Sequence, residues 1–506
     1  MSSTFEEKGS ELADLKSLSV PSRVKAFFWG RPPKDPKERK LLLKIDCLVM
    51  TYVCLNYWIN YVDRSNLANA YVSGMKEDLN MVGDQYNIIN TCFTVGYVVG
   101  MIPNNLILLK VPPRYWLSFC SLAWALLTLG MYKVSSYHQL CAIRFFQAIF
   151  ESSTFSGTHL ILGSWYKEEE INTRSATFTS SGLVGSIFSG FMQSAIYNNM
   201  DGKNGISGWR WLFIIDFIIT IPICVYGFLC FPGLPGKSKP SWVFSQENLD
   251  MAKARLPPRE ETKLDWSVFK RVVGRWHWWL FSLLWVLGGE NESFGSNSLL
   301  SLWLKYNNYS VAQRNHYPMG IFGVGITATY FSALYVDHTR GKNHWHIALL
   351  ISATLVVVSI MILAKPLSDG VMFTAQYLSG ISYAGQASFF AWANVVCRRD
   401  MQERAVVLAS MNMFSGAVNA WWSLLFYAAT TVPEFKKGCY AMLATTISAG
   451  FVAIAIRYLQ VREDKQAILD KHDSEMGQIS YENPTESDVV VEKHKVVSGV
   501  DTVESD

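Results

Sequence analysis

The sequence predicts an all-α membrane protein in which twelve transmembrane helices form two six-helix bundles. Half of the 506 residues are hydrophobic and only 17% are charged, whereas a soluble domain carries about 25% charged residues. The apolar residues gather in runs of about 20, the length that crosses a bilayer as a helix. A polar segment, residues 232–276, separates the first six runs from the last six.

The two bundles are expected over residues 41–231 and 277–460. The spans predicted in the first bundle are 45–68, 86–109, 115–134, 139–163, 175–197 and 211–231. Those predicted in the second bundle are 277–304, 316–336, 345–364, 371–396, 405–429 and 438–459. Small residues such as those of "GYVVG" (96–100) and "GVGITAT" (323–329) punctuate corresponding spans of the two halves, which indicates close helix packing and a faint parallel repeat.

Polar segments flank the bundles. Residues 1–40 are expected to be a cytosolic tail without a visible cleavable signal, and residues 461–506 a disordered cytosolic tail, because they are charged and poor in apolar residues. With the N-terminus inside, Lys and Arg concentrate in the cytosolic loops, and the linker over 232–276 alone holds nine. The charge pattern therefore predicts a multi-pass membrane protein with both termini in the cytosol.

The linker contains one candidate amphipathic helix. The stretch "DWSVFKRVVGRW" places Trp266, Phe269, Val272 and Val273 on one helical face with basic residues around it. Such a helix is typical of a segment that lies on the anionic inner leaflet of the lipid bilayer. The alternative is a simple extension of the next span.

Charged residues occur at membrane depth in several predicted spans. Asp63 and Arg64 are adjacent near the end of the first span, and Arg144 and Glu151 stand seven residues apart in the fourth. Two turns of helix place the second pair on one face, about 10 Å apart along the axis. Asp216 lies in the sixth span. Such charges are costly unless they face protein or a watery cavity, so they indicate a hydrated centre.

Other polar groups at membrane depth support the same interpretation. They include Glu290, Glu292, Tyr57, Asn60, Tyr61, Asn291, Gln386, Asn412 and Asn419. Structural alternatives remain at this point. Asp63 and Arg64 could pair with each other, Arg144 could lie at the interface, and His159 could pack between helices rather than carry protons.

One combination of these groups predicts coupled transport. A guanidinium such as that of Arg64 offers forked hydrogen bonds to a substrate carboxylate, which lysine cannot imitate. A buried acid such as Glu151 can load and release a proton. If anion and proton bind together, the cavity gains no net charge, and the loaded transporter changes conformation more easily. Transport of both in the same direction is symport.

Several classes of function are disfavoured. The net charge of +4 is too small to indicate a nucleic-acid partner, and the nine cysteines show neither zinc-ligand nor redox spacing. The chain has no nucleophile elbow or phosphate loop, so we expect no enzyme, no metal and no cofactor. A channel would need a pore-lining repeat. A non-transporting nutrient sensor, which would signal through a longer tail, stays as the alternative of another class.

Two features resemble the major facilitator superfamily in its anion–cation symporter (allantoate permease) branch: "DRSNLANA" in the first span, and the pair Arg144 and Glu151. The resemblance implies the major facilitator fold. It also implies that Arg64 meets the substrate carboxylate and that Glu151 and Asp63 handle protons, with Arg144 as a partner of Glu151 or of the anion. We therefore expect the substrate at Arg64, Asn60, Tyr57, Arg144, Asn291 and Asn412, and the proton at Glu151, Asp63 and Glu290.

Longer stretches are similar to fungal vitamin symporters, and most of all to the pantothenate–proton symporters. Among them are "CLNYWINYVDRSNLANAYVSGMKEDLNMVG", "GWRWLFIIDF" and "QERAVVLASMNMFSGAVNAWWSLLF". The resemblance covers residues 40–462. It implies import of a small carboxylate, pantothenate, together with protons by alternating access, with biotin or another small organic anion as the alternative cargo.

The chain departs from the family at one place. The glycine-aspartate-arginine motif that gates the cytosolic side of many facilitators is replaced after the second span by "PNNLILLKVPPRYW", which has no acid. Asp337 and Arg340 after the eighth span are candidates for a second-half version. The sequence does not decide which charges form the gate.

Overall fold

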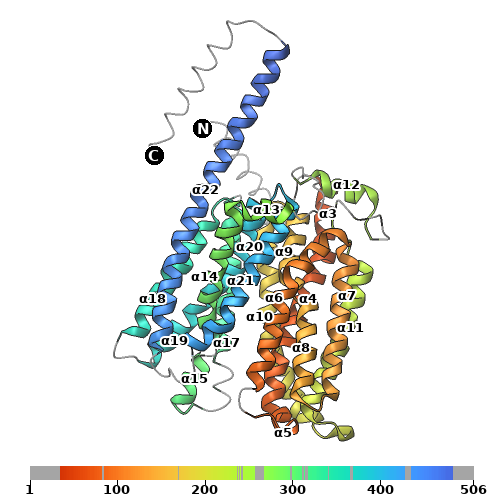
Figure 1. Cartoon of the computed structure of the whole chain (residues 1–506), viewed down its shortest axis with the longest axis vertical. Coiled ribbons are helices and arrows are strands. Elements are labelled where there is room, and N and C mark those ends of the chain that lie inside the picture. The colour runs from red at the N-terminus through yellow and green to blue at the C-terminus, as the bar shows by residue number, and fades with distance from the viewer. Residues whose placement is uncertain are drawn as a thin grey trace. The chain divides into compact units, whose positions relative to one another are not determined.

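The computed structural model describes the following residues: 33, 35–82, 85–168, 170–235, 238, 240, 243–256, 267–296, 299–309, 313, 317–339, 341–364, 368–427 and 435–482. Two compact units are distinguished, Met1–Ala453 and Ile454–Asp506. The elements of the described ranges are helices (Figure 1), which confirms the predicted all-α class.

The first unit begins with the helices expected for the first bundle. They are α3 (Pro36–Ile45), a π-helical turn (Asp46–Met50), α4 (Thr51–Ala70), a second such turn (Tyr71–Met75), α5 (Lys76–Asp78), α6 (Gln85–Lys110), α7 (Pro113–Gly130), α8 (Tyr137–Glu151), α9 (Ser153–Trp165), α10 (Ile171–Met200) and α11 (Gly208–Cys230). The fourth predicted span is therefore interrupted at Ser152, between α8 and α9. The helix of the first span also starts earlier than expected, where Asp35 caps α3 by accepting from the backbone N–H of Lys37.

The linker and the second bundle follow. Their helices are α12 (Gln246–Ala254), α13 (Ser267–Val273), α14 (Trp276–Ser296), α15 (Leu299–Tyr306), α17 (Met319–His338), α18 (His344–Leu363), α19 (Asp369–Ser379), a 3-10 turn (Gly380–Tyr383), α20 (Ala384–Val396), α21 (Met401–Phe426) and α22 (Lys436–Glu482). Helix α22 continues past residue 460, so its last part covers residues that the sequence predicted as disordered tail. Within the first unit, Figure 1 shows α12 and α13 at one end of the helices and α5 and α15 at the other.

Length and apolar composition alone mark only some of the predicted spans. In the described part of the chain, seven helices satisfy both: Pro36–Leu67, Ile88–Lys110, Pro113–Lys133, Gly208–Cys230, Met319–His338, His344–Leu363 and Lys436–Ala467. Helices α10 and α21 are not among them although they have 30 and 26 residues, and both contact helices of the other bundle. Because they face protein on several sides, they carry polar residues that lipid-facing helices avoid.

Glycines set the distance between paired helices. A Cβ on Gly96 of α6 would lie 2.3 Å from the carbonyl oxygen of Phe145 in α8. A Cβ on Gly100 would lie 2.9 Å from the carbonyl oxygen of Ile149. No side chain fits at either distance, so the predicted close packing at "GYVVG" is confirmed.

The linker helix α13 differs from the predicted interfacial helix. Its Val268 and Val272 are buried, and Arg271 forms an ion pair of 2.9 Å with Asp400. Val273 is exposed, whereas Trp266 lies outside the described residues. Since α13 packs on α14 and α21, the apolar face that the sequence assigned to lipid is turned partly toward protein.

Candidate functional site

A cavity of about 360 Å³ lies between the two bundles. Helices α4 and α6 of the first bundle and α14 and α21 of the second form most of its wall, with single residues from α9 and α20. The lining residues are Tyr57, Tyr61, Arg64, Phe93, Thr94, Tyr97, Val98, Phe155, Trp285, Gly289, Glu292, Ser296, Gln386, Asn412, Ser415, Gly416, Asn419 and Ala420. The size suits a small organic molecule.

The ion pair between Arg64 and Glu151 is the main charged feature of this wall. The Nε of Arg64 donates to Oε1 of Glu151 at 2.5 Å. The Arg64 side chain is 32% exposed, whereas Glu151 is fully buried behind it. The second oxygen of Glu151 has no hydrogen-bond partner. The guanidinium can therefore be reached from the cavity, and the acid can be reached only by exchange with the guanidinium.

Aromatic rings surround the guanidinium of Arg64. Its Cζ lies 4.7 Å from the ring centre of Tyr97, 5.5 Å from Phe93 and 5.8 Å from Tyr61. Such contacts stabilise a cation when water is excluded. They hold the guanidinium in place while leaving its forked N–H groups free of further carboxylates in the cavity wall.

The two predicted neutral residues that line the cavity take part in hydrogen bonds. The Tyr57 hydroxyl donates to that of Tyr61 at 3.1 Å. The amide of Asn412 on α21 donates to the Tyr97 hydroxyl on α6 at 3.4 Å. The second bond joins the bundles across the cavity.

A second acid lines the cavity from the other bundle. Glu292 on α14 accepts a hydrogen bond from the side-chain amide of Gln386 on α20. Asn412, Ser415 and Asn419 of α21 add amide and hydroxyl groups to the same wall. The cavity thus has a cation on its first-bundle side and an acid with neutral polar groups on its second-bundle side.

Three predicted substrate-binding residues lie elsewhere. Asn60, Arg144 and Asn291 are each about 1–2% exposed and are absent from the cavity wall in the described structure. Asn291 accepts from the Thr445 hydroxyl at 2.7 Å and so ties α14 to α22. The amide of Asn60 has no hydrogen-bond partner for either of its polar atoms.

Asp63 belongs to a cluster behind the cavity. Its carboxyl accepts from the amide of Gln147 and from the Thr128 hydroxyl, the latter at 3.3 Å. The same Gln147 accepts from Nη1 of Arg144 at 3.0 Å. One amide therefore joins Asp63 to Arg144 behind the cavity.

Glu290 is also set back from the cavity. It is 1% exposed, and one oxygen accepts from Asn419 at 3.5 Å while the other has no partner. Glu292, two residues along the same helix, is the acid that reaches the cavity. Residues two apart on an α-helix point about 200° from each other, so only one of them can line the wall.

Helical spacing could have found the residues that sequence reasoning left out. Tyr57, Tyr61 and Arg64 follow steps of four and three, and Glu292 and Ser296 continue the same pattern on α14. Phe93 and Tyr97, which also line the wall, are four apart in α6. Following this period back from Arg64 reaches Tyr61 after three residues and Asn60 after four, so the spacing adds Tyr61 but does not exclude Asn60.

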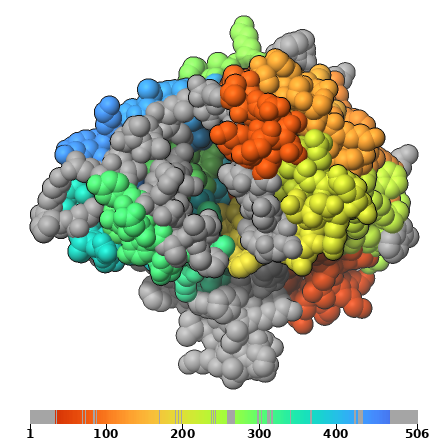
Figure 2. Space-filling view, turned by 90° about the horizontal axis from the view of Figure 1, so that it is seen from below, coloured from red at the N-terminus to blue at the C-terminus, as the bar shows by residue number. Residues whose placement is uncertain are grey.

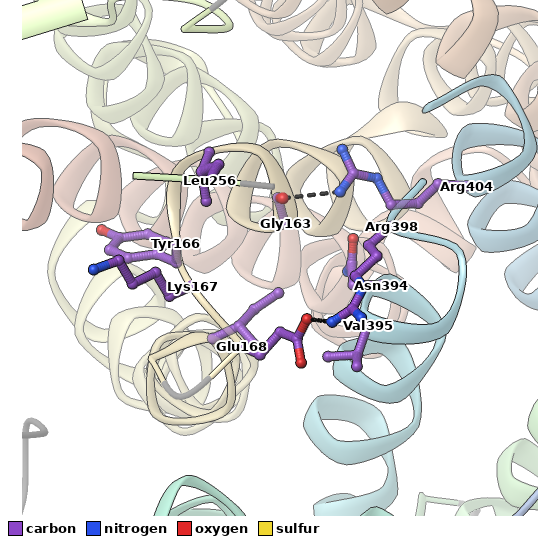
Figure 3. Close-up of a pocket in the computed structure, with 10 residues that line it drawn as sticks. Gly163, Tyr166, Lys167, Glu168, Leu256, Asn394, Val395, Arg398 and Arg404 are labelled. Atoms are coloured by element: carbon purple, nitrogen blue, oxygen red, sulfur yellow. Dashed lines mark hydrogen bonds and ion pairs between the residues drawn. The ribbon is translucent and has the colours of Figure 1, made fainter. Parts of the chain in front are cut away.

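At the end that carries α12 and α13, polar contacts close the space between the bundles (Figure 3). Arg404 of α21 donates to the carbonyl oxygen of Gly163 at 2.8 Å and to the Ser164 hydroxyl at 2.9 Å. Asn394 of α20 donates to the carbonyl oxygen of His159 at 3.0 Å. Figure 3 also shows Arg398 paired with Glu168.

Asp337 contributes to the same closure. It accepts from the backbone N–H of Thr173 at 2.8 Å and from that of Asn172 at 3.3 Å, at the start of α10. The carboxylate thereby satisfies free donors and the positive end of a helix in the other bundle. His344 bonds Asn172 at 2.9 Å. Arg340, the other candidate of the gate, lies outside the described residues.

The opposite face of the first unit is hollowed. Figure 2 shows this face from the end that carries α5 and α15, with a hollow between the green segment near residue 300 and the yellow segment near residue 200. The polar contacts described between α9 and the helices α20 and α21 come from His159, Gly163 and Ser164, at the α12 and α13 end.

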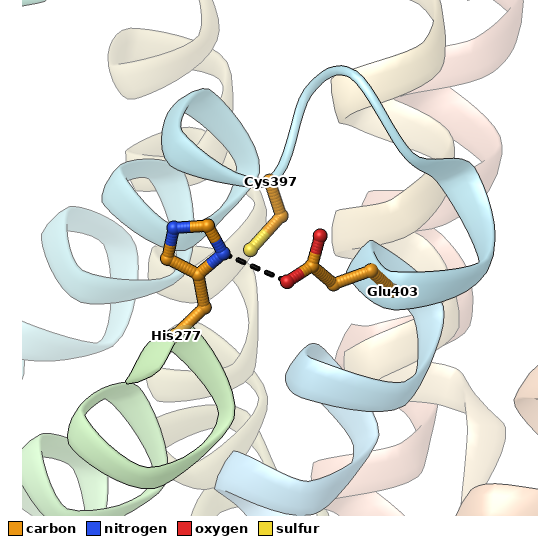
Figure 4. Close-up of side chains that lie close together, drawn as sticks. All are labelled: His277, Cys397 and Glu403. Atoms are coloured by element: carbon orange, nitrogen blue, oxygen red, sulfur yellow. Dashed lines mark hydrogen bonds and ion pairs between the residues drawn. The ribbon is translucent and has the colours of Figure 1, made fainter. Parts of the chain in front are cut away.

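One further cluster has side chains of the kinds that bind metals. His277, Cys397 and Glu403 are buried, and one donor atom of each lies within 4.8 Å of the others (Figure 4). Nδ1 of His277 lies 2.7 Å from Glu403, whose other oxygen binds Arg275. Burial raises the pKa of the Cys397 thiol, which opposes the thiolate that a metal needs. We therefore interpret the cluster as an ion-pair network that joins the starts of α14 and α21.

Comparison with known proteins decides the family. A family model described as Major Facilitator Superfamily matches residues 53–423. The chain belongs to the Major Facilitator Superfamily. Membership identifies it as a multi-pass membrane transporter and not an enzyme.

Curated relatives match most of the chain. It is 60% identical to the pantothenate transporter FEN2 of Saccharomyces cerevisiae, over 85% of each chain. It is 41% identical to the pantothenate transporter liz1 of Schizosaccharomyces pombe, over 86% of this chain and 85% of that one. The identity to the vitamin H transporter of Saccharomyces cerevisiae is 31%, over 87% of this chain and 76% of that one.

Solved structures support the fold. The proton:xylose symporter XylE aligns with a TM-score of 0.60 at 11% identity, over 82% of this chain and 95% of that one. The human organic anion transporter MFSD10 aligns with a TM-score of 0.58 at 12% identity, over 81% and 99%. At such identities the likeness concerns the fold alone, and it confirms the predicted major facilitator fold.

Proposed function

We propose that this transporter imports pantothenate together with protons across the plasma membrane by alternating access. The observation that carries the proposal is the ion pair between Arg64, which lines the cavity, and Glu151, which is buried behind it. The identities of 60% and 41% to two pantothenate transporters support the cargo.

The geometry suggests how anion and proton are coupled. The cargo carboxylate approaches Arg64 from the cavity and competes with Glu151 for the guanidinium. If the cargo takes the guanidinium, Glu151 is left as a buried, unpaired charge, which is costly. A proton on Glu151 removes this cost. The loaded cavity then has the same net charge as the empty one, because one anion and one proton have entered.

The other predicted proton groups, Asp63 and Glu290, are proposed to act behind the cavity rather than on the cargo. Asp63 is joined through Gln147 to Arg144, which lies on the same helix as Glu151. This arrangement gives a proton a set of polar groups beside Glu151. The role assigned to Arg144 is accordingly that of a partner to this cluster.

We assign the described conformation to the outward-facing state. The loops rich in Lys and Arg lie with α12 and α13 at the closed end, and such loops face the cytosol. The hollowed face of Figure 2 then looks outward, in agreement with the predicted topology that has both termini in the cytosol. Import begins from this state.

Two alternatives are less well supported. Biotin also offers a carboxylate to Arg64, but the identity to the vitamin H transporter is about half that to FEN2. A non-transporting sensor would have no need of an ion pair exposed to a cavity of cargo size.

The test is uptake of radiolabelled pantothenate in yeast cells that lack their own carriers for pantothenate and biotin. Uptake should rise as external pH falls from 7 to 5, and a protonophore should abolish accumulation. Unlabelled pantothenate should compete at much lower concentration than unlabelled biotin. Accumulation that persists with the protonophore contradicts proton coupling, and stronger competition by biotin contradicts the cargo.

A further inference from the structure

The second-bundle wall of the cavity contains an acid whose role the coupling mechanism does not explain. Glu292 lines the cavity, and its described hydrogen bond comes from Gln386 rather than from a cation. Among the described lining residues Arg64 carries the only positive charge, and Glu151 holds it. A carboxyl that faces a cavity without a cation beside it is poised to accept hydrogen bonds from a ligand.

The residues near Glu292 also favour a ligand group that forms hydrogen bonds. Gln386, Asn412 and Asn419 provide amides, and Ser415 provides a hydroxyl, on the same side of the cavity. A Cβ on Gly289 would lie 2.1 Å from the Ser415 hydroxyl oxygen, so the glycine leaves room for that hydroxyl beside Glu292. Neutral donors and acceptors of this kind bind hydroxyls and amides.

We propose that Glu292, positioned by Gln386, binds the donor-bearing end of the cargo and fixes the direction in which the cargo lies. The inference rests on the proposed function, since it places the carboxylate at Arg64 and the hydroxyls at Glu292. Pantothenate has this polarity, with a carboxylate at one end, an amide in the middle and two hydroxyls at the other end.

This arrangement defines a substrate class. Monocarboxylates whose far end carries hydroxyl or N–H donors satisfy both poles. A dicarboxylate would bring its second charge against Glu292 and is rejected by repulsion. A plain aliphatic acid would leave the Glu292 carboxyl desolvated and unpaired, which weakens binding strongly, because sites built for hydrogen bonds reject ligands that lack them.

The experiment measures inhibition of labelled pantothenate uptake by three unlabelled compounds. They are pantothenate, its analogue with both hydroxyls replaced by hydrogen, and an aliphatic dicarboxylate of similar length. In the wild type the hydroxyl-free analogue should inhibit at least about tenfold more weakly than pantothenate, since hydrogen bonds to a charged group are the stronger kind. The dicarboxylate should inhibit hardly at all.

In Glu292→Gln the preference for hydroxyls should fall to about threefold or less, and the dicarboxylate should become an inhibitor. This gain of inhibition cannot come from general damage to the protein. Glu292→Asp keeps the charge, so it should still reject the dicarboxylate while binding pantothenate more weakly. If Glu292→Gln does not reach the membrane, the Asp variant tests the proposal by the ratio between pantothenate and the hydroxyl-free analogue, which should fall below that of the wild type, whereas a structural role leaves it unchanged.

Glu247→Gln is the matched control, because the same change is made on an exposed acid outside the cavity wall, in a pair with Lys37. Its ratio between pantothenate and the hydroxyl-free analogue should equal that of the wild type. Equal weakening of all three compounds in Glu292→Gln, without a change of ratio, overturns the inference and assigns Glu292 to structure. Absence of pantothenate uptake by the wild type instead overturns the proposed function itself.

Discussion

Arg64 shows how one side chain is prepared for an anion. Its guanidinium is held by Glu151 on one side and by three aromatic rings around it, yet it remains reachable from the cavity. Charge alone would be supplied equally well by lysine. The planar fork, its fit to a carboxylate and its stacking on rings are properties of arginine.

Arg64→Lys should therefore raise the KM for pantothenate at least about tenfold, because a forked, charge-assisted contact is lost. Initial rates of uptake over a range of concentrations measure this. Arg114→Lys is the control, since Arg114 donates to the carbonyl oxygen of Phe228 away from the cavity. A wild-type KM in Arg64→Lys contradicts the role of the guanidinium.

Glu151 is the residue proposed to bind the proton that is transported with the cargo. Glu151→Gln keeps the shape of the side chain but cannot exchange a proton. Accumulation against a gradient should be lost, whereas exchange of external labelled for internal unlabelled pantothenate should persist. Uptake and counterflow in the same cells separate the two. Glu247→Gln, a change in an exposed pair with Lys37, is the control. Undiminished accumulation in Glu151→Gln removes the coupling mechanism.

Among the helices, packing distance is set by residues without side chains. Helices α6 and α8 approach so closely at Gly100 that a Cβ there would meet the Ser152 hydroxyl at 2.6 Å. The α8 side of this contact leads directly to Glu151. The position of the coupling acid therefore depends on a glycine in another helix.

Gly100→Ala should destabilise the transporter by about 1–3 kcal/mol through overpacking. Thermal unfolding of the purified protein in detergent measures the change. Gly323→Ala is a matched control, because Gly323 is also helical and nothing lies within 4 Å of an added Cβ. Alanine is favoured over glycine in a helix, so that variant should be unchanged or slightly more stable. Equal melting temperatures for the two variants contradict the packing account.

The entire transporter has to separate its bundles at the α12 and α13 end in order to release cargo there. Arg404, Asn394 and Asp337 hold that end through main-chain groups of the other bundle. Bonds to main-chain groups do not depend on the partner's side chain. This explains how the end stays closed although the first half lacks the acid of the family's gating motif.

Arg404→Gln should shift the equilibrium toward opening of that end by at least about tenfold, because two charge-assisted hydrogen bonds are lost. Distances between spin labels at Lys110 and Lys342, both exposed and in different bundles, report the opening. Arg114→Gln, whose contact lies within the first bundle, should leave the distances unchanged. An unaltered distance distribution in Arg404→Gln contradicts the role of this contact.

The sequence by itself determined that the chain is a helical membrane protein and which polar residues interrupt its apolar runs. Runs of apolar residues of bilayer length leave no other solution, and polar residues within them are too costly to occur without a purpose. The importance of Arg64 and Glu151 followed from the same reasoning. Tyr57 and Asn412, which the sequence predicted to bind the substrate, line the cavity.

Only the tertiary structure decided which polar residues meet. In a soluble protein, the apolar stripe of a helix marks the face that packs against the core. In a membrane protein, the lipid and the protein interior are both apolar, so an apolar stripe does not show which face of a helix is turned inward. The rotation of α14 that turns Glu292 rather than Glu290 to the cavity is therefore fixed by its neighbours. The same holds for Arg404 and Gly163, which become partners because two bundles far apart in the sequence pack together.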